Sequence, residues 1–169
     1  MRLFIAINFD KEIIYSLKRV QGDLKKCGLE GRYTKEENLH LTLAFIGEYG
    51  NPDDVLDALE ELEFTPFEIS LSGFGSFGDL YWVGLEENPH LKSLVKRLRK
   101  SLSDSQIPFD KKKFSPHITL VRKGVFMKGK KSFPQHLPEM KMTVRSISLM
   151  RSDFGKNGVN YTVVGEVGE

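Results

Sequence analysis

The sequence predicts an α+β fold with two antiparallel or mixed sheets. Segments typical of strands outnumber those with helical periodicity, and several turn signals join neighbouring strands as hairpins. A strand, a helix and a further strand follow one another in both halves of the chain, over residues 3–46 and 80–120. This weak repeat predicts two similar lobes around a central cleft. Because no linker rich in proline, glycine or serine separates the halves, we expect residues 1–169 to form one bilobal domain.

The first elements are a buried strand and a capped helix. Residues 3–7 form a continuous apolar run, which is typical of a central strand. Asp10 is a good N-cap residue, and Gly28 stands where a glycine commonly follows a helix, so we expect a helix through about Lys26. The core-facing stripe of this helix is Ile13, Leu17, Val20 and Leu24.

A second strand and a short helix come next. Residues 30–38 are polar and irregular, and residues 39–46 have the composition of a strand. After a turn at residues 47–51, Pro52 is suited to the first position of a helix. Its inward residues are expected to be Val55, Leu56, Leu59 and Leu62.

The central part predicts a pair of strands and the last helix. Residues 67–71 and 80–85 are strand-like, and the glycine-rich stretch 72–78 between them indicates a hairpin connection or a bulge. Asn88 is placed to cap a third helix. Its apolar stripe is Leu91, Leu94, Val95, Leu98 and Leu102.

The last third is expected to hold three strands. Residues 116–122 form one, and residues 123–138 are a long polar segment with weak structural signals. Residues 142–151 and 159–167 are predicted to form a hairpin around the turn at 154–158.

Composition limits the class of protein. The net charge is +2, so no strong overall field points to nucleic acid or membrane. The single cysteine, Cys27, excludes an intramolecular disulfide and is expected to be a small buried or half-buried residue. No signal peptide and no apolar run of about 20 residues is visible, so we expect a cytoplasmic protein without a membrane partner. Nothing in the sequence requires more than a monomer.

The most informative feature is a short motif that occurs twice. His40-Leu-Thr42-Leu and His117-Ile-Thr119-Leu each place a histidine and a threonine two positions apart among strand-forming residues. Alternate residues of a strand share a face, so each imidazole stands beside a hydroxyl while the intervening residue faces the core. Two histidines in matching contexts favour a catalytic over a structural role. His90 and His136 lack this context and are expected at the surface.

This set of side chains suits phosphodiester cleavage. Imidazole titrates near neutrality, so one histidine can accept a proton while the other donates one. Thr42 and Thr119 can donate hydrogen bonds to phosphoryl oxygens. Residue chemistry leaves open which histidine is the acid. A zinc site is the competing use, but catalytic zinc usually has three protein ligands, and neither motif contains an Asp or Glu. We therefore expect no metal and no other cofactor.

Basic and aromatic residues near the motifs are candidates for substrate contacts. Arg122 ends the second motif strand, but an ideal strand places it on the face opposite His117, so it reaches the cleft only through a bend or bulge. Basic residues around His117 can attract a polyanion: Lys111, Lys112, Lys113, Arg122, Lys123, Lys128, Lys130 and Lys131. Aromatic residues that could stack on a base are Phe45, Phe74, Phe77, Tyr81, Trp82 and Phe114.

The two motifs and the chain ends resemble a known family. The segments 38–47 and 114–122 resemble the paired signatures of the two-histidine (2H) phosphoesterase superfamily. The opening residues 1–7, together with 149–152 and 158–161, are similar to its RNA 2',3'-cyclic phosphodiesterase branch, long called 2'-5' RNA ligase. The resemblance covers nearly the whole chain.

The resemblance implies a pseudo-twofold fold with outer helices and hydrolysis of an RNA 2',3'-cyclic phosphate to a 2'-phosphate. By the same resemblance, His40 is the proton donor and His117 the proton acceptor, with Thr42, Thr119 and Arg122 at phosphate-contacting positions. The expected partner is RNA with a 2',3'-cyclic phosphate end or a cyclic nucleotide. Two alternatives remain: reversible 2'-5' ligation of ends like those of tRNA halves, and RNA-end binding without catalysis.

Overall fold

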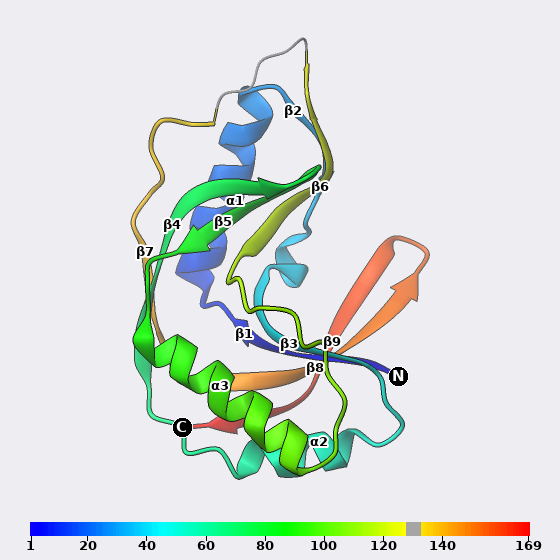
Figure 1. Ribbon diagram of the computed structural model, residues 1–169. Helices are drawn as coiled ribbons and strands as arrows, with labels where there is room; N and C mark the ends of the chain where they lie inside the picture. The colour runs from blue at the N-terminus through cyan, green and yellow to red at the C-terminus, as the bar shows by residue number, and fades with distance from the viewer. Residues whose placement is uncertain (128–132) are drawn as a thin grey trace.

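Two antiparallel sheets form the scaffold of the protein. The computed structural model describes residues 1–127 and 133–169 and confirms the α+β class (Figure 1). The four-stranded sheet has the order β3 (His40–Glu48), β1 (Arg2–Asn8), β8 (Ser146–Gly155) and β9 (Gly158–Gly168). The five-stranded sheet has the order β2 (Leu29–Tyr33), β6 (Ile118–Phe126), β5 (Leu80–Leu85), β4 (Phe67–Phe77) and β7 (Met140–Val144). Every neighbouring pair is antiparallel, and one motif strand lies in each sheet.

The helices cross between the sheets. Helix α1 (Lys11–Lys26) follows β1 of the four-stranded sheet but packs on the five-stranded one, against β2, β6 and β7. Helix α3 (Pro89–Asp104) follows β5 and packs against β3, beside α2 (Pro52–Glu60). Helices α1 and α3 thus each cover the sheet that does not contain the strand before them (Figure 1). No helix within residues 1–127 and 133–169 has the length and apolar character needed to cross a bilayer.

The predicted helix caps are confirmed. The side chain of Asp10 accepts a hydrogen bond from the backbone N–H of Ile13 at 2.9 Å, and Asn88 accepts one from Leu91 at 3.1 Å. Gly28 follows α1 with φ of +89°, a conformation that glycine adopts without strain. Cys27 is half-buried, as expected.

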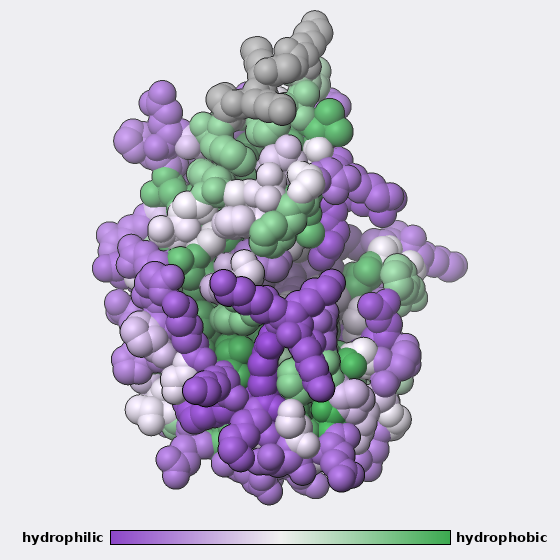
Figure 2. Space-filling view, viewed as in Figure 1, coloured by the Kyte–Doolittle hydropathy of each residue, from purple (hydrophilic) through white to green (hydrophobic). Residues whose placement is uncertain are grey.

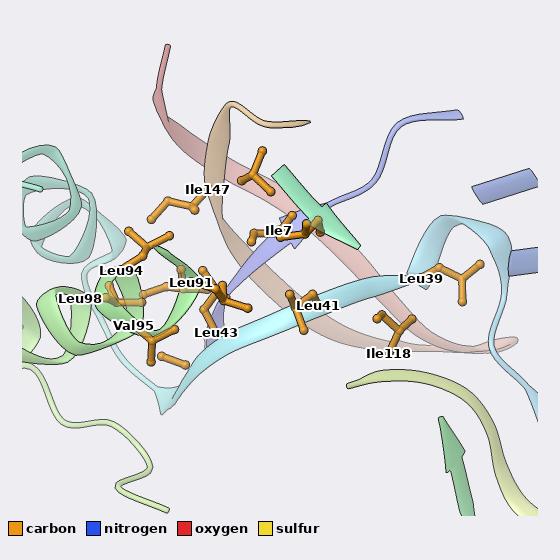
Figure 3. Close-up of a cluster of buried hydrophobic side chains, with 14 of the residues drawn as sticks. Ile7, Leu39, Leu41, Leu43, Leu91, Leu94, Val95, Leu98, Ile118 and Ile147 are labelled. Carbon is orange, nitrogen blue, oxygen red and sulfur yellow. The ribbon is translucent and has the colours of Figure 1, made fainter. Parts of the chain in front are cut away.

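One hydrophobic core lies behind both motifs. Leu41 and Ile118, the middle residues of the two His-x-Thr motifs, are both 0% exposed and belong to the same buried cluster. Figure 3 shows Leu43 of β3 turned toward Leu91 and Val95 of α3, while Ile118 of β6 lies near Leu39 at the other end. The backs of the two motif strands therefore share one core.

The segment at residues 30–38 is more regular than predicted. Residues 29–33 form the edge strand β2, which pairs with β6, and Glu36–Asn38 form one turn of 3-10 helix. Leu29 is buried and Tyr33 half-buried against the core, but a register shift between Glu30 and Arg32 interrupts the alternation. A sequence window therefore shows no period of two, and pairing with the distant β6 makes this segment a strand.

Three other boundaries also differ from the prediction. Strand β4 runs through the glycine-rich stretch to Phe77, with a bulge between Leu71 and Phe74 and a tight turn after Phe77. The predicted strand 142–151 is two strands, because the chain passes from one sheet to the other at Arg145. Strand β6 continues to Phe126, whereas residues 128–132 of the predicted polar segment lie outside the described residues.

Candidate active site

His40 lies at the start of β3 in a hydrogen-bonded and aromatic setting. Its Nδ1 donates to the carbonyl oxygen of Asn38 at 2.7 Å, which fixes the tautomer of the neutral ring because a carbonyl only accepts. The Nε2 atom then accepts from the Thr42 hydroxyl at 2.8 Å. Rings of Phe4 and Tyr161 pack on the imidazole with centroid distances of 5.1 and 5.2 Å. The imidazole is therefore held in one orientation.

His117 lies immediately before β6 and has a matching backbone contact. Its Nδ1 donates to the carbonyl oxygen of Ser115 at 2.7 Å, again two residues before the histidine. Phe77 packs edge-on against this ring at 5.0 Å, and Trp82 lies at 6.3 Å. Nδ1 is thus occupied by a backbone carbonyl in both histidines, while Nε2 of His40 is bonded to the Thr42 hydroxyl.

A bulge turns Arg122 toward the face of His117. Trp82 pairs with Thr119 but its neighbour Tyr81 pairs with Val121, so Leu120 is an extra residue in β6. The extra residue shifts the alternation, and Arg122 then shares a face with His117 and Thr119. The structure thus contains the bulge on which the placement of Arg122 depends.

The same bulge occurs in the other lobe. Ala6 pairs with Thr42 and Ile5 with Ala44, so Leu43 is the extra residue in β3. Phe45 therefore joins the face of His40 and Thr42, and it is 54% exposed. Phe45 and Arg122 occupy equivalent positions, each five residues after a motif histidine.

The pKa of His40 responds to its burial and to charges on the other sheet. Burial lowers the pKa of His40 below its usual value. The hydrogen bond to the Asn38 carbonyl acts in the opposite direction, while the positive charges of Arg122 and His117 lower the pKa further. His117 and Arg122 belong to the segment of the other sheet that carries the second motif, so their charges act on His40 from the other lobe. In the free protein this field favours neutral His40.

The remaining site candidates differ in their surroundings. Thr42 and Thr119 are both half-buried, but Thr42 is bonded to His40 whereas the Thr119 carbonyl accepts from the Thr34 hydroxyl at 2.9 Å. Among the candidate stacking residues, Phe45 and Phe77 are exposed and Trp82 is half-buried. Those that pack against the core are Phe74, Tyr81 and Phe114.

Three of the predicted lysines lie in the loop before β6. Lys111, Lys112 and Lys113 are exposed in the loop before β6, and the backbone N–H of Asp110 donates to the Phe45 carbonyl at 2.8 Å. This bond holds the loop along β3. Figure 2 shows a hollow between the upper and lower parts of the molecule, with hydrophilic residues below it and residues of intermediate to hydrophobic character above it. The other predicted lysines, Lys128, Lys130 and Lys131, lie outside the described residues.

Three residues near His40 were not singled out from the sequence. Asn38 supplies the carbonyl bonded to Nδ1, and its side chain donates to the Val159 carbonyl at 2.9 Å. Phe4 and Tyr161 come from β1 and β9, strands remote from the motif in sequence. In residues 1–127 and 133–169, no three His, Cys, Asp or Glu side chains lie together as a metal site would require.

Comparison with known proteins agrees with this architecture. The 2'-5' RNA ligase superfamily matches residues 12–156. The RNA 2',3'-cyclic phosphodiesterase of Thermotoga maritima is 34% identical over 132 residues, covering 72% of this chain and 70% of that protein. The protein of that name from Methanothermobacter thermautotrophicus is 30% identical over 181 residues, covering 96% and 95%.

Solved structures share the fold over nearly the full chain. The crystal structure of E. coli LigT complexed with 3'-AMP matches with a TM-score of 0.86 and 25% identity, covering 99% of this chain and 97% of that one. TT0787 of Thermus thermophilus matches with a TM-score of 0.78 and 28% identity, covering 99% and 97%. Because the family match spans most of its length and the relatives cover both lobes, the chain belongs to the 2'-5' RNA ligase superfamily.

Proposed function

We propose that this protein hydrolyses the 2',3'-cyclic phosphate at an RNA end to a 2'-phosphate, using His40 and His117 and no metal. The observation that carries the proposal is the equivalent presentation of the two imidazoles. Each donates from Nδ1 to a backbone carbonyl two residues earlier, at 2.7 Å in both lobes, so Nε2 is the atom that meets the substrate, once the Thr42 hydroxyl turns away from Nε2 of His40. The RNA 2',3'-cyclic phosphodiesterases among the relatives support the choice of substrate.

In the proposed reaction, water attacks the cyclic phosphorus and the bond from phosphorus to the 3' oxygen breaks. His117 accepts the proton of the attacking water at Nε2, and His40 donates a proton from Nε2 to the departing 3' oxygen. Thr42, Thr119 and Arg122 hold the non-bridging oxygens as negative charge builds up on them. The products are a 2'-phosphate and a 3' hydroxyl, and proton exchange with solvent restores the histidines.

The assignment of His40 as the proton donor follows the family resemblance. It requires that the bound substrate favour the protonated form of His40. His40 must carry a second proton, whereas burial and neighbouring positive charges lower its pKa in the free protein. A bound phosphate brings negative charge beside Arg122 and His40, which favours the protonated ring. Substrate binding is thus proposed to favour protonation of His40. Because the titrations of His40 and His117 are coupled, the rate is expected to depend on pH with a bell-shaped profile.

The test is cleavage of an end-labelled RNA oligonucleotide with a 2',3'-cyclic phosphate in the presence of a chelator. The wild-type protein is expected to yield a 2'-phosphate. His40→Ala and His117→Ala should each lower the rate by about 10²-fold or more, the usual size of acid–base catalysis. His90→Ala is the matched control, since His90 is exposed on α3.

The alternative outcomes are distinct. A 3'-phosphate product would keep the two-histidine chemistry but contradict protonation of the 3' oxygen. Activity that survives both substitutions would show that the site is elsewhere, and activity lost in chelator would contradict the metal-free reaction. If the wild-type protein cleaves no cyclic phosphate but binds the RNA end, the non-catalytic alternative replaces the enzyme.

The superfamily description also favours a second candidate, 2'-5' ligation. The same site would join a 2',3'-cyclic phosphate to a 5' hydroxyl if this hydroxyl takes the place of water: His117 accepts its proton, a 2'-5' bond forms, and His40 protonates the departing 3' oxygen. In the reverse reaction, cleavage of the 2'-5' bond to the cyclic phosphate, the two histidines exchange roles. Incubation with both RNA ends should then give a product that resists nucleases specific for 3'-5' bonds. Absence of this product at high concentrations of both ends would leave hydrolysis as the single activity. We further propose that the protein acts as a monomer, which light scattering can check.

A further inference from the structure

Two arginines stand opposite each other on the strands beside the candidate active site. Arg32 of β2 pairs with Arg122 of β6 in the antiparallel ladder, so the two side chains project from the same face. Both are exposed, and neither forms an ion pair with a carboxylate of the described residues. Like charges directly opposite on neighbouring strands destabilise a sheet. An anion bound between the two guanidinium groups would remove this repulsion.

The pair lies on one particular side of His117. Toward β5 and β4, the surroundings of His117 are the aromatic rings of Phe77 and Trp82. Toward the other edge of the sheet, β6 and β2 present Arg122 and then Arg32. A polyanion that leaves the histidines is therefore attracted across β6 toward the edge strand β2, and not across β5.

Two further basic residues follow these arginines in the sequence. Lys35 is exposed and its Nζ donates to the Asn157 carbonyl at 2.6 Å, which joins the end of β2 to the turn of the β8–β9 hairpin. Lys123 is exposed next to Arg122. The exposed cations that share the face of His117 and lie on adjacent strands are thus Arg122 and Arg32.

We infer that Arg32 binds the phosphodiester immediately upstream of the terminal nucleotide, so that the preferred substrate is an oligonucleotide and not a mononucleotide. This inference rests on the proposed function, which puts the cyclic phosphate at His40, His117 and Arg122. Neighbouring strands lie about 5 Å apart, so Arg32 is one strand spacing farther along the surface than Arg122. A guanidinium binds phosphate oxygens through two parallel hydrogen bonds, which suits this contact.

The test compares cyclic phosphate substrates of different length. We would measure kcat/KM for adenosine 2',3'-cyclic phosphate and for the dinucleotide ApA with a 2',3'-cyclic phosphate and a 5' hydroxyl. The wild-type protein should prefer the dinucleotide about tenfold, the size of one exposed charge-assisted contact. Arg32→Gln should abolish most of this preference, and Arg32→Lys should keep part of it.

A control variant and a salt series distinguish a specific contact of Arg32 from non-specific attraction between basic residues and the RNA phosphates. Arg19→Gln removes the same charge from the exposed face of α1, and the preference for the dinucleotide should stay. The slope of log(kcat/KM) for the dinucleotide against log(salt) should be about 0.7 smaller in Arg32→Gln than in wild type, as for loss of one phosphate contact on a single strand. Because the substitution relieves repulsion, the melting temperature should not fall, which excludes misfolding.

Failure of this inference is distinguishable from failure of the proposed function. Equal kcat/KM for the two substrates in wild type, or a preference that survives Arg32→Gln, would overturn the role of Arg32 while leaving the hydrolysis intact. If neither substrate is cleaved, binding is measured in place of hydrolysis: the dissociation constant of adenosine 2'-phosphate is compared with that of ApA with a terminal 2'-phosphate, in wild type and in Arg32→Gln. An Arg32-dependent preference for the dinucleotide would then support the subsite without the reaction, and its absence would overturn both.

Discussion

Replacement of Thr42 by valine tests the hydroxyl that stands next to His40. Valine has nearly the same shape, so the substitution removes the hydrogen-bonding group and little of the packing. The Thr42 hydroxyl lies 2.8 Å from Nε2 of His40 in the free protein and, in the proposed reaction, turns to donate to a phosphoryl oxygen. Thr42→Val therefore loses one contact to developing negative charge and leaves Nε2 without its partner.

The size of the effect follows from the value of one such hydrogen bond. A bond to a charged group contributes about 1.5–3 kcal/mol. With about 1.4 kcal/mol for each factor of ten, kcat/KM should fall roughly 10- to 150-fold. Most of the loss should appear in kcat, because the interaction strengthens as charge develops. Steady-state hydrolysis of a short cyclic phosphate oligonucleotide measures this, with a thermal melt to verify folding.

Thr42→Ser is the matched control, since it keeps the hydroxyl and loses a methyl group. It should retain most of the wild-type kcat/KM. Thr119→Val should reproduce the loss in the other lobe, because Thr119 has the equivalent place after His117. A Thr42→Val protein with kcat/KM within about twofold of wild type, far below the loss of a charge-assisted hydrogen bond, would refute the assignment of this hydroxyl to the reacting phosphate.

Three further predictions concern charge and stability. Arg122→Gln should raise the pKa of His40 in the free protein, because the charge of Arg122 lowers that pKa. NMR titration of the His40 imidazole measures the shift. An unchanged pKa would contradict the placement of Arg122. The free energy of unfolding should fall as the pH drops below about 6.5. In the unfolded protein His40 has its ordinary pKa and binds a proton, whereas the folded protein lowers the pKa of His40 and disfavours that proton. Denaturant melts of His40→Asn should therefore show a weaker pH dependence. Leu41→Ala should cost about 2–5 kcal/mol, because Leu41 is fully buried in the core shared by both sheets. One coincident transition by fluorescence and circular dichroism is expected in wild type and variant, and two separate transitions would contradict the single domain.

The parts of the fold that the sequence predicts well depend on local chemistry. Asp10 and Asn88 cap helices through contacts within three residues, and the His-x-Thr spacing sets a shared face within one strand. The edge strand β2 and the division at Arg145 depend on pairing with distant strands. The rings of Phe4 and Tyr161 reach His40 from both ends of the chain, so no local pattern indicates that contact.

The two bulges show why the face of a residue is harder to predict than its strand. A strict period of two places Phe45 and Arg122 on the core side, whereas the extra residues Leu43 and Leu120 bring both side chains to the face of the histidines. The repeat itself indicates the bulge. Five positions after a motif histidine stand an aromatic residue in one half and an arginine in the other. A regular strand would bury this arginine in the core, which would be costly. A bulge in both strands accommodates them. The symmetric scaffold thereby presents unlike groups, an exposed ring that offers a stacking surface in one lobe and a cation suited to phosphate in the other. In the proposed reaction, we expect this asymmetry to give a nucleotide one preferred direction across the two histidines, which is what distinct acid and base roles require.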